Sequence, residues 1–431
     1  MSYNEPPILT GSKVGLPGGN ILSTHITVKD LRRSNRSAVL RSLLLDGPLN
    51  RVALSRLTGL SSASVTNVIT ELLEERLVVE TGTEVSDGGR PPVQLNVNPG
   101  FGVLIGVDIG ETGIRIEAFD LGLHMLSGEV VPIDPRRPMI EGVVADIAGS
   151  VRRIVDKASP GPGVIGVGVG VPGIVSGPAE QASVHAPNIG WEDVPLSGLL
   201  SETLAMPVFM DNCAKTLGLA EMWFGAGRGA RDAFVTLLGT GVGAAIFSHG
   251  KLFRGVSSSA GEWGHTCIVM NGRRCRCGSR GCVEAYAGAY AVVERWMAGK
   301  ETPTGATDEE TLIDELIHAA EREAAAKEIL DQVAEAVGIG LSNVVNLFNP
   351  ERIIIGGWLG LRLGPLLLRR IKEVLSEQAL AYPAARVSIQ LGELGRDAVA
   401  LGASTLVLDD LVSRGGKPRL YESSLSRARR L

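Results

Sequence analysis

The first hundred residues carry three stretches of apolar residues at helical spacing, followed by two alternating stretches. In "SNRSAVLRSLLLDG" the apolar side chains share one face and Gly47 ends the pattern, while "NRVALSRLTG" predicts a short helix ending at Gly59. Ser61 is a suitable N-cap for a third helix, whose apolar residues recur with a 3.6-residue period. "LVVETGTEVSDGGRPPVQLNVN" then predicts two strands joined by a Gly-rich tip.

This order of elements is typical of a winged helix-turn-helix, which we expect over 30–98. A third helix lying in the DNA major groove would present its non-core side chains to base edges: Ser62, Ala63, Ser64, Thr66 and Asn67. Arg36 would contact phosphate, and Arg90 at the wing tip would reach a minor groove. A helical protein-interaction module is the alternative, since residues 1–97 hold 10 basic and 9 acidic residues.

After Pro99 the pattern changes to strands. "GVLIGVDIGETGIRIEAFDLGLHMLSGEVV" predicts three strands with Gly turns, and an amphipathic helix and a buried strand follow. "DAFVTLLGTGVGAAIFSHGKLFRG" resembles the first strand group, and helices then alternate with "RIIIGG" and "RVSIQL". We therefore predict an α/β domain over 99–411 with two similar lobes of the actin-like type found in sugar kinases, Hsp70 and actin. Flexible residues 1–29 and a basic tail, 412–431, would flank the folded part.

Composition narrows the class of protein. The chain has 431 residues, 44% of them hydrophobic, and a net charge of −5. This is enough for two or three cores and excludes a wholly basic nucleic-acid coat protein. The N-terminus shows no signal peptide, and no apolar run reaches the ~18 residues of a membrane helix. We expect a cytoplasmic protein that does not enter the membrane.

Three of the five cysteines fall within eight residues. "GHTCIVMNGRRCRCGSRGC" contains His265, Cys275, Cys277 and Cys282, one imidazole and three thiols that suit tetrahedral zinc. Four protein ligands leave no open position, so this zinc would brace the loop 265–282 and would not activate water. The remaining Cys213 and Cys267 are predicted to be ordinary small buried residues.

These features together resemble the ROK family, named for repressor, open reading frame and kinase. The resemblance covers about residues 30–410 and rests most on "AGEWGH", "CRCGSRGCVE" and "DIGET", with support from "VPG", "APNIGW" and "NPERIIIGG". The winged helix-turn-helix places the chain with the transcriptional regulators of that family.

The resemblance implies a sugar site between the lobes. Its residues would hydrogen-bond sugar hydroxyls, and in this sequence they are Asn188, Asn212, Glu262, His265 and Glu284. His265 would offer one ring nitrogen to zinc and the other to the ligand.

Two positions depart from the kinase pattern of the family. Family kinases place an Asp, the general base, at the position of Cys213, and a thiol is neutral near pH 7 unless it is activated. Losing a positioned base costs ~10²–10⁴-fold in rate. They also have a second Gly after Asp-Ile-Gly, where this chain has Glu111. We therefore expect the kinase-like domain to lack enzyme activity.

The combined prediction is a sugar-responsive DNA-binding regulator, a repressor of carbohydrate genes that binds a sugar or sugar phosphate without phosphorylating it. A homodimer, or a dimer of dimers, would bind a double-stranded operator. The alternative is an active ATP-dependent sugar kinase with a regulatory DNA-binding domain. Lys215, beside the missing base, is either a receptor for a sugar phosphate or a solvated lysine at a helix start.

Overall fold

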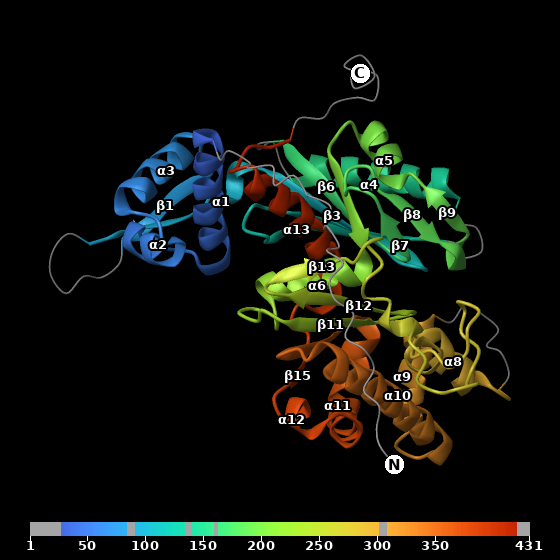
Figure 1. Cartoon of the computed structure of the whole chain (residues 1–431). Coiled ribbons are helices and arrows are strands. Elements are labelled where there is room, and N and C mark those ends of the chain that lie inside the picture. The colour runs from blue at the N-terminus through green and yellow to red at the C-terminus, as the bar shows by residue number, and fades with distance from the viewer. Residues whose placement is uncertain (1–26, 84–90, 134–138, 159–162, 301–307, 420–431) are drawn as a thin grey trace, which may run out of the picture.

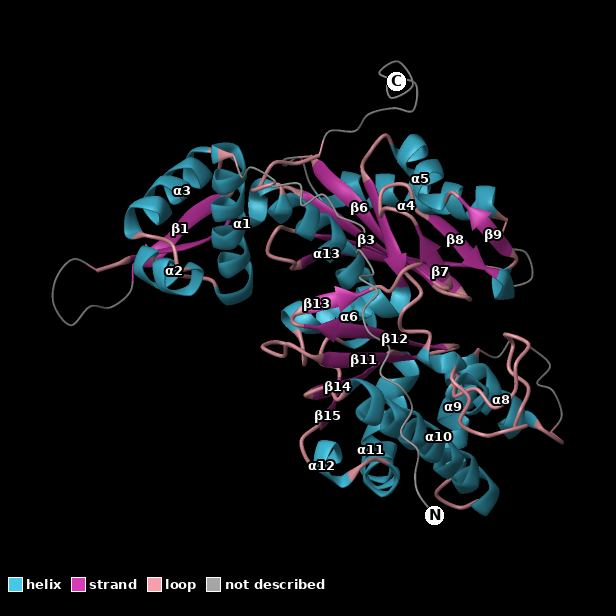
Figure 2. Cartoon of the chain, in the orientation of Figure 1, coloured by secondary structure: helices cyan, strands magenta, loops and turns pink. Residues whose placement is uncertain are grey.

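A computed structural model describes residues 27–83, 91–133, 139–158, 163–300 and 308–419. A small unit at the N-terminal end stands to one side of two lobes that are stacked on each other (Figure 1). Helices and strands are mixed in all three parts (Figure 2). None of the helices in the described ranges is both long enough and apolar enough to cross a membrane.

The small unit has the predicted winged-helix order. Helices α1 (Val28–Asp46), α2 (Arg51–Thr58) and α3 (Ser62–Glu74) precede strands β1 (Val78–Thr83) and β2 (Val93–Val97), which pair antiparallel. Asn50 and Ser61 cap α2 and α3 with their side chains, and Gly59 ends α2 at a φ of 71°, a value that favours glycine. Buried Val39, Leu54 and Val65 contribute to its core.

The first lobe is built on a five-stranded sheet of order β10-β6-β3-β4-β5. Strands β3 (Val103–Ile109), β4 (Gly113–Phe119) and β5 (Met125–Pro132) form an antiparallel meander, and β6 (Val164–Val171) and β10 (Val208–Asn212) add on parallel to β3. A small sheet and two helices complete the lobe: β7 (Ile174–Ser176), β8 (Ser183–Ala186), β9 (Trp191–Val194), α4 (Ile140–Ala158) and α5 (Leu196–Leu204).

The second lobe repeats this topology. Its sheet has the order β13-β12-β11-β14-β15, again with an antiparallel meander followed by two parallel additions. The predicted duplication is therefore confirmed strand for strand. Its strands are β11 (Ala233–Leu238), β12 (Val242–Ser248), β13 (Lys251–Phe253), β14 (Arg352–Gly356) and β15 (Ser388–Leu391). Its helices are α7 (Glu284–Ala287), α8 (Ala289–Met297), α9 (Glu309–Ala319), α10 (Ala324–Phe348), α11 (Trp358–Gln378) and α12 (Ala381–Ala384).

Two helices join the three parts. Helix α6 (Cys213–Phe224) follows β10 and packs on β11 and β12, and α13 (Ala398–Ser413) packs on α6, β3, β6 and α1. The packing of α6 on α13 is close, because a Cβ at Gly402 would lie 1.8 Å from the carbonyl oxygen of Thr216. Helix α13 therefore touches both α6 and the small unit (Figure 1).

The C-terminal end differs from the expected loose tail at 412–431. Val412 is buried, and a Cβ on Gly416 would lie 2.9 Å from Leu77 and 3.1 Å from Leu40. Arg419 pairs with Asp410 at 2.6 Å. Residues 412–416 thus pack against the winged-helix unit, which composition alone did not reveal. Residues 420–431, and 1–26 of the expected N-terminal tail, lie outside the described residues.

Candidate functional site

The outer face of α3 carries the side chains predicted to meet DNA bases. Ser62, Ala63, Thr66 and Asn67 are exposed, and Ser64 is half-buried with its backbone N–H bonded to Ser61. The Thr66 hydroxyl donates to the carbonyl oxygen of Ser62 at 2.8 Å. Asn67 is thus the residue of this set with a long, exposed amide that offers both a donor and an acceptor. Arg90 at the wing tip lies outside the described residues.

Arg36 requires a correction. Its side chain is 5% exposed, and its guanidinium donates to Glu71 at 3.0 Å, to Glu75, and to the carbonyl oxygen of Gly415 at 2.6 Å. These partners within the chain occupy the nitrogens of the buried guanidinium, so it is not available to a DNA phosphate. The sequence pattern suggested an exposed arginine because neither Glu71 nor Gly415 is near it along the chain.

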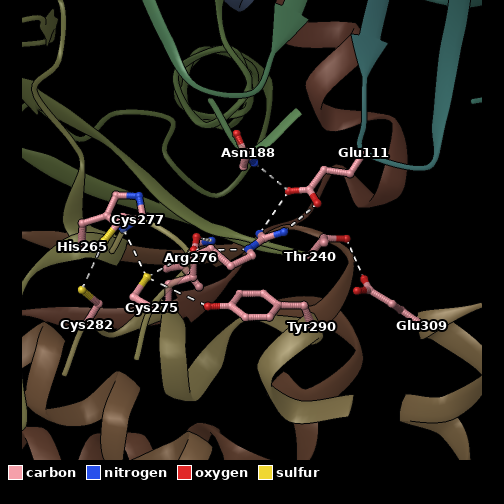
Figure 3. Close-up of polar contacts among 12 residues, drawn as sticks. Glu111, Asn188, Thr240, His265, Cys275, Arg276, Cys277, Cys282, Tyr290 and Glu309 are labelled. Carbon is pink, nitrogen blue, oxygen red and sulfur yellow. Dashed lines mark hydrogen bonds and ion pairs between the residues drawn. The ribbon is translucent and has the colours of Figure 1, made fainter. Parts of the chain in front are cut away.

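The four residues predicted to bind a metal converge. The ligand atoms of His265, Cys275, Cys277 and Cys282 all lie within 4.8 Å of one another. Cys277 and Cys282 Sγ are 3.8 Å apart, and so are Cys275 Sγ and His265 Nδ1 (Figure 3). Four bonds of about 2.3 Å to a tetrahedral centre place sulfur atoms about 3.8 Å apart, so the donor set and spacing fit such an ion. The group could therefore hold a metal.

Two further contacts surround this cluster. The Tyr290 hydroxyl lies 4.0 Å from Cys275 Sγ, and the Glu284 carboxylate lies 3.7 Å from the same sulfur. Cys267, predicted to be buried, is instead exposed, with its Sγ 3.5 Å from the carbonyl oxygen of Val269. Although Cys267 lies only two residues after the cluster residue His265, its side chain is exposed to solvent.

The junction of β10 and α6 holds Cys213, where the resemblance leads us to expect an Asp in the family kinases. Asn212 caps α6: its side chain accepts from the Ala214 N–H at 2.8 Å and donates to the Gly173 carbonyl at 2.7 Å. The Cys213 thiol follows it. Burial, together with the nearby Asp108 carboxylate, raises the pKa of Cys213 to about 12. The thiol is therefore neutral near pH 7.

Lys215 is buried and not solvated. Its side chain, 2% exposed, donates from Nζ to the carbonyl oxygen of Ser258, and burial lowers its pKa although Asp211 opposes the shift. Asp211 itself is paired with Arg254 at 2.6 Å. The expectation of a solvated lysine at the helix start is therefore wrong. Arg254, which the sequence patterns did not single out, ties the 254–258 segment to this turn.

The residues expected to bind sugar lie at different depths. Asn188 is exposed and donates to Glu111 at 3.3 Å, whereas Glu284 is 6% exposed and accepts from the Val242 N–H at 2.9 Å. Burial raises the pKa of Glu262, and the charges of His265, Lys215 and Glu284 also act on it. Glu262, His265 and Glu284 therefore share one electrostatic environment.

The sequence patterns also missed Arg276 at this site. Arg276, between two of the cluster cysteines, pairs with Glu111 at 2.8 Å and 3.1 Å, and its guanidinium lies 4.0 Å from the centre of the Tyr290 ring. The only signal in the sequence was an arginine inside the Cys-x-Cys motif. Figure 3 shows Glu111, Arg276 and Asn188 meeting above the cysteines.

The chain joins a winged helix to a duplicated two-lobed domain with a Cys/His cluster in its second lobe. This combination defines a sugar kinase-like fold fused to a winged helix-turn-helix. The ROK family domain matches residues 104–410. The chain therefore belongs to the ROK family.

Both transcriptional regulators and sugar kinases of this family are similar to the chain. The xylose repressor of Caldicellulosiruptor bescii is 34% identical over 89% of this chain and 97% of its own length. A ROK family transcriptional regulator described as a homologue of E. coli MLC has a TM-score of 0.73 at 26% identity, covering 90% of this chain and 98% of its own. The ROK glucokinase of Streptomyces griseus, solved with glucose and AMPPNP, has a TM-score of 0.60 at 32% identity and covers 71% and 99%.

Proposed function

We propose that this protein is a sugar-responsive DNA-binding regulator that represses carbohydrate genes. The proposal rests chiefly on the fusion of an exposed, polar α3 face to a kinase-like domain in which Cys213 replaces the base. The xylose repressor relative spans the same two parts, since it matches 89% of this chain. DNA would be contacted by the α3 face and the effector by the residues between the lobes.

The proposed effector is a sugar or a sugar phosphate. Carboxylates, an amide and an imidazole suit hydroxyl groups, and Glu262, His265 and Asn188 are the residues best placed to supply them. His265 Nδ1 faces Cys275, so Nε2 is the nitrogen left for a ligand. Asn212 and Glu284 would support these groups, because their own polar atoms already bond the backbone. The buried Lys215 is the group that would favour a phosphorylated ligand.

We propose zinc for the Cys/His cluster. His265, Cys275, Cys277 and Cys282 would hold it, and it would supply a structural cross-link to the loop 265–282. Three thiolates and one imidazole favour zinc over hard cations such as Mg²⁺.

The absence of kinase activity is proposed on two observations. The thiol of Cys213 is neutral, so it cannot take a proton from a sugar hydroxyl, and Glu111 adds a carboxylate to the turn where the family kinases have glycine. An active sugar kinase with a regulatory domain is the second candidate. It is favoured by the fold, which the Streptomyces griseus glucokinase shares over 99% of its length.

One set of experiments separates these functions. Wild-type protein is used to select DNA from a random pool, and the selected sequence is titrated with and without xylose, glucose, N-acetylglucosamine and their phosphates. A regulator selects one operator, of palindromic form if the protein is dimeric, and one sugar shifts its affinity. ATP-dependent turnover of any of these sugars in a coupled assay, without DNA selection, would instead establish the kinase.

A further inference from the structure

An ion pair between Glu111 and Arg276 joins the two lobes beside the proposed effector site. Glu111 lies in the turn between β3 and β4 of the first lobe, and Arg276 lies between Cys275 and Cys277 in the second. Two guanidinium nitrogens donate to the two carboxylate oxygens, at 2.8 Å and 3.1 Å. This bidentate arrangement is the geometry in which an arginine–carboxylate pair is strongest.

Both side chains are supported by their surroundings. They are only 20% and 29% exposed. The Tyr290 ring lies 4.0 Å from the guanidinium of Arg276, and a Glu284 oxygen lies 3.9 Å from it. A cation held over an aromatic face and near a second carboxylate keeps its orientation better than a solvated arginine. The pair is therefore part of the packed site and differs from an ordinary surface ion pair.

The position of Arg276 depends on the Cys/His cluster. Its two chain neighbours are both cluster residues, and the loop closes on itself through Cys275 N–H to the Ser279 carbonyl at 2.8 Å and Gly278 N–H to the Cys275 carbonyl at 3.0 Å. Glu111 depends on the effector side, because it also accepts a hydrogen bond from Asn188 at 3.3 Å. Asn188, Glu111 and Arg276 thus form a chain from the effector site to the cluster loop (Figure 3).

We propose that Glu111 is the positioning residue that couples effector binding to closure of the lobes. The coupling part of this inference rests on the proposed function. A sugar hydroxyl that accepts from the Asn188 amide would release Glu111 from that amide. Both carboxylate oxygens would then be held by Arg276 alone, and the Glu111–Arg276 bridge would strengthen. The glutamate that replaces the kinase glycine would in this way serve the regulator.

The bridge itself is tested without any ligand. Hydrogen exchange is followed in full-length wild type, E111Q, R276Q and D314N, with the metal content of each variant measured. Asp314 pairs bidentately with Arg362 at 2.6 Å within the second lobe, so D314N is the matched control. E111Q should speed exchange of the Cys275 and Gly278 amides at unchanged metal content, and R276Q should speed that of the Gly110 amide, which bonds Gly113 at 2.9 Å.

Two results would overturn the bridge. One is that each substitution changes exchange only in its own lobe. The other concerns the charge-swapped double variant E111R/R276E, in which a bridge of reversed polarity should restore slow exchange. The bridge is overturned if the amides at both sites exchange as fast in the double variant as in the faster of the single variants E111R and R276E.

The coupling is tested by calorimetry with D-xylose, D-glucose, N-acetylglucosamine and the phosphate of each. E111Q should weaken binding of the active sugar about tenfold, within the range usual for coupled sites, while D314N leaves it unchanged. Equal affinities of wild type and E111Q would overturn the coupling. If none of the sugars binds wild type, the proposed function fails and the coupling with it, whereas the exchange result still decides the bridge.

Discussion

Arg36 of α1 donates to Glu71 of α3 at 3.0 Å, across the interface between the first and third helices. The arginine is 5% exposed, and Glu75 binds a second nitrogen of the same guanidinium. Helix α3 bears the proposed base-reading face, so the angle at which that face is presented depends on this buried arginine.

Replacing Arg36 should therefore loosen α3. In R36M, Glu75 loses Arg36 and Glu71 keeps only Arg32, at 2.7 Å, so we expect a loss of about 2–3 kcal/mol in the opening free energy of α3. Native-state hydrogen exchange of the α3 amides measures it. R41M is the matched control, because Arg41 pairs with Asp409 at the surface and should cost under about 1 kcal/mol. Equal losses in the two variants would contradict a special role for Arg36.

The metal prediction compares two cysteines of the same loop. Wild type should carry one zinc per chain, and C275S should lose it and exchange faster throughout 265–282, because a thiolate ligand is removed. C267S alters an exposed cysteine outside the cluster and should keep both the metal and the exchange rates. Elemental analysis of the purified proteins checks this. Full zinc content in C275S would refute the assigned ligand set.

The DNA prediction concerns Asn67. Its exposed amide should contact a base edge, so N67A should weaken binding to the selected operator by about 1–3 kcal/mol and leave affinity for random DNA unchanged. Fluorescence anisotropy on both duplexes gives the comparison. A parallel drop on operator and random DNA would mean that Asn67 contacts the phosphate backbone.

The kinase prediction treats Cys213 and Glu111 together. C213D restores a carboxylate at the position of the base, but Glu111 still occupies the β3–β4 turn, so we expect no ATP-dependent turnover above wild type. C213D/E111G removes both obstacles and should exceed either single variant in a coupled assay. Turnover by C213D alone equal to that of the double variant would show that Glu111 does not exclude the nucleotide.

A pH dependence is expected from Glu117 of β4. Burial, with added repulsion from Asp397, raises the pKa of this 2%-exposed carboxyl to about 8, even though Arg115 lies 3.4 Å away. The unfolded chain ionises near 4.5, so the native state binds the extra proton between these values. Protonation of Glu117 therefore stabilises the native state fully below pH 4.5. This contribution to the free energy of unfolding is lost as the pH rises to 8, by up to about 1.4 kcal/mol per pH unit.

E117Q should remove this slope. Melting temperatures of wild type and E117Q, measured from pH 5 to 9, should diverge in favour of the variant as the pH rises. Parallel curves would mean that Glu117 ionises in the native protein.

Features set by neighbouring residues were predictable from the sequence. The cap at Ser61, the stop at Gly59 and the strand meanders depend on short segments, and the structure has them where the patterns placed them. The Cys/His cluster was predictable for the same reason, since Cys275, Cys277 and Cys282 lie on one short loop.

Features set by distant pairs were not predictable. The buried Arg36 donates to the carbonyl oxygen of Gly415, 379 residues away in the sequence, and the buried Lys215 donates to the carbonyl oxygen of Ser258. Arg276 acquires its role only because the first lobe brings Glu111 to it. In each case the partner that buries or engages the charge comes from a distant part of the chain.

The contact between Arg36 and Gly415 also sets an order in time. During translation, Arg36 leaves the ribosome long before Gly415 is added to the chain. The carbonyl oxygen of Gly415 accepts the arginine Nε–H at 2.6 Å. The winged helix is therefore synthesised well before the residue that completes the contacts of Arg36. A nascent or prematurely terminated chain carries the α3 side chains but lacks the carbonyl that holds α1 in place. Complete packing of this unit thus requires a chain that extends at least to Gly415.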